Sequence, residues 1–83
     1  MSLENEVKTE ILVIAGIPEE AERLSDATIL QRMGFDELMC RDLEERCQEI
    51  ADAASTGRRI RIGSITPANT VGHCIGLVKD LTQ

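Results

Sequence analysis

The sequence predicts an all-α protein, a small bundle of three main helices with one or two short helical turns in the connections. Its 83 residues suit a single domain, residues 1–83. Three stretches repeat apolar residues at intervals of three or four, the helical spacing, and Gly and Pro lie between them. Hydrophobic residues make up 42% and charged residues 29%, as in a folded globule. Phe35 is the single aromatic residue, so the core must be aliphatic.

The first helix is predicted over Leu3–Ala15, with Ser2 as its N-cap and two glutamates in its first turn. Gly16 and Pro18 then form a stop signal. Residues 17–33 form a long connection in which short helical turns can start at Pro18 and after Asp26. The buried stripe of this helix is expected to be Leu3, Val7, Ile11 and Ile14.

The second helix is predicted over Glu37–Ala54, capped by Asp36. Its buried face is expected to hold Met39, Leu43, Cys47, Ile50 and Ala54. Of these, Leu43 and Ile50 are predicted to be core residues. The acidic residues of the helix are expected to face water: Glu44, Glu45, Glu49 and Asp52.

Residues 58–62 alternate arginine and isoleucine, a strand-like pattern. Because a lone strand has no partner here, we interpret them as an extended loop whose isoleucines touch the core. The last helix follows Pro67, with Asn69 or Thr70 as its cap. Gly72 and Gly76 either weaken this helix or allow a neighbour to approach closely. Its buried face is expected to be Val71, Cys74 or Ile75, Val78 and Leu81.

Charge and composition restrict the partners. The net charge of −6 argues against nucleic-acid binding and favours partners with basic surfaces. No stretch approaches the ~20 apolar residues of a membrane span, so we expect no membrane insertion. The acidic N-terminus is unlike a signal peptide, and an odd number of cysteines suits a reducing compartment. We therefore expect a cytoplasmic monomer.

Three segments resemble the acyl carrier protein family, in the order that the family shows. Residues 26–38 read DATILQRMGFDEL, where carriers commonly have Asp, a small residue, Ser or Thr, a hydrophobic pair, Gly, an apolar residue and Asp-Ser-Leu. Residues 14–20, IAGIPEE, are similar to the end of a carrier's first helix. Residues 65–71, ITPANTV, look like the entry to its last helix. The resemblance covers nearly the whole chain and implies an acyl-carrier-like helical bundle.

The chain departs from the family at the attachment position, which reads Asp36-Glu37-Leu38. In carriers the central residue is a serine whose hydroxyl is esterified with 4′-phosphopantetheine. A carboxylate cannot form that phosphodiester, and Ser55 and Ser64 lie in loops far from a helix start. The stretch before the last helix is also longer and more basic than is usual in the family.

These features predict a non-enzymatic, carrier-like protein that carries no cofactor and binds other proteins through its acidic second helix. Glu44, Glu45 and Glu49 are the expected contact residues, and biosynthetic enzymes with basic surfaces are the expected partners. The alternative is a working acyl or peptidyl carrier of fatty-acid, polyketide or related biosynthesis, loaded with 4′-phosphopantetheine. It requires a serine natively at position 37, or a different register. A small enzyme or a metal protein is a third possibility.

Other reactive side chains have ordinary explanations. Cys40 and Cys47 are two helical turns, about 10 Å, apart, too far for a disulfide. A zinc site needs about four ligands, and the chain has no CxxC pair. We therefore expect core or half-exposed cysteines, with Cys40 the candidate for exposure. His73 and Cys74 diverge by about 100° on a helix and are poorly placed as a catalytic dyad, so His73 is expected to be a surface histidine. The loop arginines either are solvated or bind phosphate: Arg58, Arg59 and Arg61.

Overall fold

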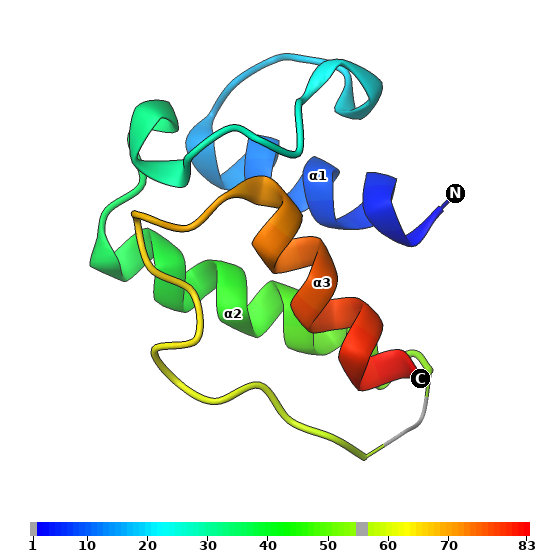
Figure 1. Ribbon diagram of the computed structural model, residues 1–83. Coiled ribbons are helices and arrows are strands. Elements are labelled where there is room, and N and C mark those ends of the chain that lie inside the picture. The colour runs from blue at the N-terminus through cyan, green and yellow to red at the C-terminus, as the bar shows by residue number, and fades with distance from the viewer. Residues whose placement is uncertain (1, 55–56) are drawn as a thin grey trace.

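The computed structural model describes residues 2–54 and 57–83 and confirms the all-α prediction. Three α-helices contact one another in pairs, α1 and α2 running in opposite directions with α3 across them (Figure 1). Two 3-10 turns, η1 and η2, lie in the connection between α1 and α2. Within the described residues the only β-type contact is an isolated bridge between Ile29 and Thr70. The elements are α1 Leu3–Ala15, η1 Ala21–Arg23, η2 Leu30–Met33, α2 Glu37–Asp52 and α3 Val71–Thr82.

Each α-helix begins at a side-chain cap. Ser2, Asp36 and Thr70 each accept a hydrogen bond from the backbone N–H three residues later, at 3.2, 2.9 and 3.1 Å. These bonds partner N–H groups that no helical carbonyl can reach. The last helix is therefore capped by Thr70, the second of the two predicted candidates. α1 ends at Ala15, and the next residue is Gly16, whose φ of 70° is easily reached only by glycine.

The core lies where the three helices meet. Leu43 of α2 is fully buried, as predicted, whereas Ile50 is half-buried and packs at the edge of the core. α2 ends at Asp52, two residues before the predicted end, so the exposed Ala54 does not belong to its buried face. Residues 55–56, in the predicted helix-ending segment, lie outside the described residues. The fully buried large side chains and thiols are Val7, Ile11, Leu30, Cys40, Leu43, Cys47, Ile65, Val71, Cys74 and Val78.

The connection between α1 and α2 is bound to the entry of α3. Segment 26–31 runs beside segment 67–72 and exchanges four backbone hydrogen bonds with it, all between 2.8 and 2.9 Å. One of them joins the N–H of Gly72 to the carbonyl of Asp26. A Cβ at position 72 would lie 3.2 Å from that carbonyl oxygen, so Gly72 permits the close approach. Gly76 has open space around it and plays no such part.

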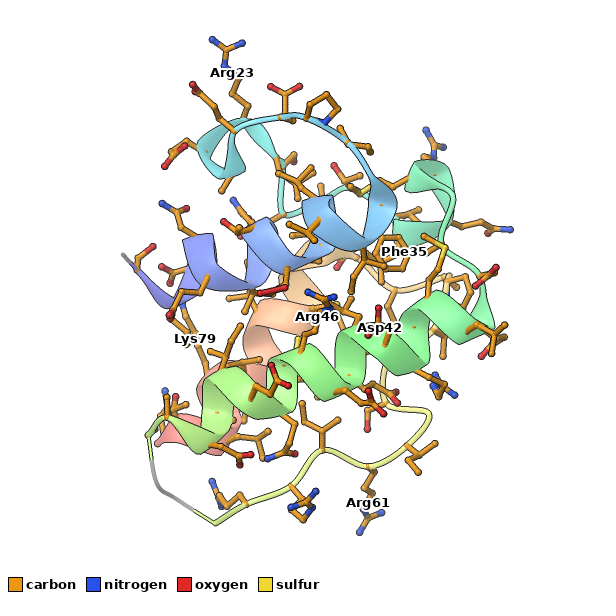
Figure 2. The ribbon with its side chains drawn as sticks, turned by 180° about the vertical axis from the view of Figure 1, so that it is seen from behind. Arg23, Phe35, Asp42, Arg46, Arg61 and Lys79 are labelled. Atoms are coloured by element: carbon orange, nitrogen blue, oxygen red, sulfur yellow. The ribbon has the colours of Figure 1, made fainter. Side chains whose placement is uncertain are left out.

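Residues 57–65 form a loop that follows α2 on the side opposite α1 (Figures 1 and 2). The loop is extended and contains no strand, as predicted. Ile60 packs against the core and Ile65 is fully buried. Ile62 is 87% exposed, so the prediction that it touches the core is wrong. The alternation places Ile60 and Ile62 on one side, but only Ile60 of the two packs against the core.

Candidate functional site

The start of α2 holds the three residues of the predicted attachment position. Asp36 is the N-cap, and Glu37 is the first residue of the helix. The Glu37 side chain is 71% exposed, with its Oε2 atom 3.7 Å from Nη1 of Arg41. Leu38 follows and is 79% exposed, although it is a large apolar residue. An acid in the first turn complements the positive end of the helix dipole, so Glu37 suits its position energetically.

Four side chains of α2 form its solvent face, which we call the outer stripe: Leu38, Asp42, Glu45 and Glu49. Their spacing of four, three and four residues puts them on one side of the helix. Glu45 and Glu49 are exposed and Asp42 is partly so. Asp42 lies 3.5 Å from Arg46, whose other contact is Glu10 of α1 at 2.8 Å (Figure 2). The hydrogen bond that Arg46 donates to Glu10 raises the pKa of Arg46, which therefore stays charged.

Glu44 was expected to face water with the other acids of α2, and this expectation is wrong. The residue is only 6% exposed. Its Oε2 atom accepts hydrogen bonds from the backbone N–H groups of Gly63 and Ile65, both at 2.9 Å. Its Oε1 atom lies 3.0 Å from Nε of Arg41, an ion pair in which the N–H is not aimed at the oxygen. Arg41 in turn donates to the carbonyl of Ile65.

Gln48, one turn after Glu44, also binds the loop. Its Oε1 atom accepts from the N–H of Ile60 at 2.7 Å, and its Nε2 atom donates to the carbonyl of Arg58 at 2.9 Å. The side of α2 that holds Arg41, Glu44 and Gln48 is thus used to fasten the loop. The sequence alone does not predict this role. On a helical wheel Glu44 lies beside the apolar stripe, which is a signal of burial. The sequence does not indicate which backbone groups bind its carboxylate.

A groove of about 640 Å³ runs between α2 and the loop. Ile60 and Ile62 give it an apolar wall from the loop, while Glu45 and Glu49 of the outer stripe lie on the helix side. Arg59 is the loop cation that lines it. Its described lining residues are Arg41, Glu44, Glu45, Gln48, Glu49, Asp52, Arg59, Ile60 and Ile62.

The three loop arginines have different surroundings. Arg58 donates to the carbonyl of Asp80 at 2.6 Å and lies 3.5 Å from that of Gln83, so it binds the C-terminal end of α3. A cation there satisfies carbonyls that have no helical partner and complements the dipole. Arg59 lines the groove, and Arg61 points away from α2 (Figure 2). Because Arg58 is engaged in this way, Arg59 and Arg61 are the loop arginines that remain as candidates for binding phosphate.

The three cysteines are free and buried, so the expectation that Cys40 is the exposed one is wrong. Burial raises the pKa of Cys40, and it raises the pKa of Cys47 and of Cys74 to about 12. Their thiols are consequently protonated near neutral pH and are poor nucleophiles. His73 is at the surface, as predicted, with Nε2 2.9 Å from the carbonyl oxygen of Ser64.

The described part of the chain also bears on metal binding and on membrane spanning. No group of three or more His, Cys, Asp or Glu side chains there is placed to hold a metal ion. Among the same residues, no helix has the length and apolarity needed to cross a bilayer. When the chain is compared with protein-family models, with curated proteins and with solved structures, none of them matches it.

Proposed function

We propose that this chain is a carrier-like protein that bears no phosphopantetheine and binds basic surfaces of other proteins through the outer stripe. The observation that carries the proposal is the stripe itself. Asp42, Glu45 and Glu49 present three carboxylates on the solvent face of α2, with the exposed Leu38 at one end. The fold uses other faces of the same helix for the core and for the loop, whereas Glu45 and Glu49 remain exposed.

The chemistry of Glu37 supports the first half of the proposal. Phosphopantetheine is attached through a hydroxyl, and the first residue of α2 is an exposed carboxylate. Ser64 is a poor substitute, because it lies in the loop and its hydroxyl donates to the carbonyl of Arg61. The resemblance to carriers suggests that the partners belong to lipid or polyketide biosynthesis, with enzymes that recognise carriers as the first candidates.

The expected contact residues change in one respect. Glu44 is buried under the loop and is replaced by Asp42 in the proposed surface. A basic partner helix would lay Lys or Arg side chains against the three carboxylates and an aliphatic side chain against Leu38. Such an arrangement is steered by charge and anchored by apolar contact. Its affinity should fall as salt concentration rises, because the carboxylates are exposed.

The binding prediction can be tested with a probe peptide and isotope-labelled protein. The probe is an amphipathic Lys/Leu helix of about 14 residues, or four turns. We expect NMR shift changes at the amides of the outer stripe. The double variant Glu45→Lys/Glu49→Lys should weaken binding about tenfold, because two attractive pairs of about 0.2–1 kcal/mol each become repulsive.

A matched variant separates a specific surface from general attraction to an acidic protein. Glu6→Lys/Asp80→Lys changes the net charge equally, at exposed residues of α1 and α3. We expect it to leave the affinity within about twofold of wild type, since exposed charges beyond a Debye length are screened. Equal weakening by both double variants would refute the outer stripe as the binding surface.

A further inference from the structure

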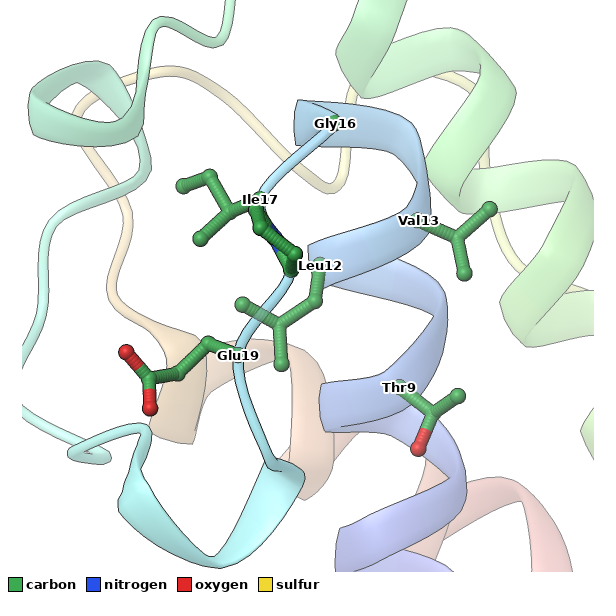
Figure 3. A pocket seen from close by; sticks show the side chains of 7 residues that line it. Thr9, Leu12, Val13, Gly16, Ile17 and Glu19 are labelled. Carbon is green, nitrogen blue, oxygen red and sulfur yellow. The ribbon is translucent and has the colours of Figure 1, made fainter.

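A second surface lies at the C-terminal end of α1, away from the outer stripe. After Gly16 the chain reverses, and segment 17–19 runs back beside the last turns of the helix (Figure 3). A shallow groove of about 270 Å³ results. Its described lining residues are Thr9, Leu12, Val13, Gly16, Ile17, Pro18 and Glu19. None of them belongs to α2.

The groove is mostly apolar and partly uncovered. Leu12 is buried, but Val13 is 58% exposed and Ile17 is 36% exposed. Figure 3 shows these two side chains on opposite sides of the end of α1. Small-molecule pockets typically measure about 300–1,000 Å³, so this groove is too small for such a ligand. Its size suits one aliphatic side chain of a docked segment, the usual anchor of a peptide contact.

The electrostatic environment of the groove is negative from two sources. Glu19 is the charged residue among its described lining residues. The C-terminal end of a helix carries about −0.5 of an elementary charge, and the last turn of α1 has no basic side chain to balance it. A cation placed here would be attracted by both groups.

We propose that this groove docks a short segment of a protein partner in which an aliphatic side chain stands next to Lys or Arg. The aliphatic side chain enters the groove between Val13 and Ile17, and the cation faces Glu19 and the end of α1. A second copy related by a two-fold axis is a poor occupant, because that interface would bring Glu19 and the negative helix end against themselves. The net charge of −6 adds to that repulsion.

The test uses the full chain, isotope-labelled for NMR, and capped tetrapeptides as probes. Ala-Leu-Arg-Ala should shift the amides of residues 12–19 in a saturable manner. Ala-Leu-Glu-Ala and Ala-Ala-Arg-Ala should each bind about fivefold more weakly, the equilibrium equivalent of about 1 kcal/mol. Glu19→Lys should reduce the preference for the Arg peptide over the Glu peptide, whereas Asp80→Lys, at an exposed residue of α3, should not.

Three results would overturn the proposal. Shifts spread over the whole surface would indicate no docking site. Equal affinity for the Arg and Glu peptides would indicate an apolar patch without charge selection. Concentration-dependent shifts at residues 12–19 without peptide, together with a dimer in sedimentation, would identify a second copy as the occupant. Because no lining residue is shared with the outer stripe, failure here and failure of the proposed function are separate outcomes.

Discussion

Leu43→Ala is expected to lower the free energy of unfolding by about 2–5 kcal/mol, the usual range for a buried leucine. The Leu43 side chain is fully buried and belongs to the single core of the bundle. The substitution removes its apolar contacts and leaves a cavity that the neighbouring helices can only partly close. For a domain of this size each kcal/mol corresponds to about 4–8 °C in Tm, so thermal denaturation should show a fall of at least about 8 °C.

Leu38→Ala is the matched control, because it makes the same change on the same helix. Leu38 is 79% exposed, and its truncation should alter stability by no more than about 0.5 kcal/mol. Comparable losses for the two variants in a urea titration would mean that the rotation of α2 about its axis differs from the one described.

Glu44→Ala is expected to be the second large loss, about 2–4 kcal/mol, because it removes the acceptor that fastens the loop to α2. The buried N–H of Ile65 loses its partner, which costs about 1–3 kcal/mol by itself. The N–H of Gly63 is more exposed and can donate to water instead, so its loss of Glu44 adds less to the destabilisation. Arg41 is left beside an empty site, although its partial exposure limits the penalty. Chemical denaturation measures the total.

One further variant separates the hydrogen bonds of Glu44 from its charge, and a second serves as an exposed control. Glu44→Gln keeps a carbonyl oxygen that can accept both N–H groups and should lose less than half as much as Glu44→Ala. Glu45→Ala, next to it but exposed, should be within about 0.5 kcal/mol of wild type. Hydrogen exchange at Ile65 should accelerate in Glu44→Ala alone. Unchanged protection there would contradict the role of Glu44 in holding the loop.

Local chemistry made the helices predictable. The caps at Ser2, Asp36 and Thr70 and the stop at Gly16 each depend on residues within one turn, so their signals are contained in short stretches of sequence. The same is true of the exposed position of Glu37. It follows directly from the cap at Asp36, because the first turn of a helix that starts at the surface is accessible to solvent.

Long-range contacts were not predictable in the same way. Glu44 is buried because the loop passes over it, and its two partners lie 19 and 21 residues away along the chain. The exposure of Ile62 has a related cause. The alternation in residues 58–62 distinguishes two sides of the loop, but it does not show how far along the loop the contact with the core extends. Cys40 lies one turn after the exposed Glu37, but its side of α2 faces the core, so closeness to the start of the helix does not indicate exposure.

We propose that Glu37 prevents the attachment of phosphopantetheine, and the most direct test is the intact mass of the protein after incubation with a permissive phosphopantetheinyl transferase and coenzyme A. Glu37→Ser is the matched variant, since it restores Asp-Ser-Leu and removes one charge near the positive end of α2. The variant should stay folded and gain the mass of one phosphopantetheine group, slowly if the basic loop hinders docking of the transferase. Wild type should keep its unmodified mass under the same conditions. A phosphopantetheine adduct on wild type would contradict the account and establish the chain as a working carrier.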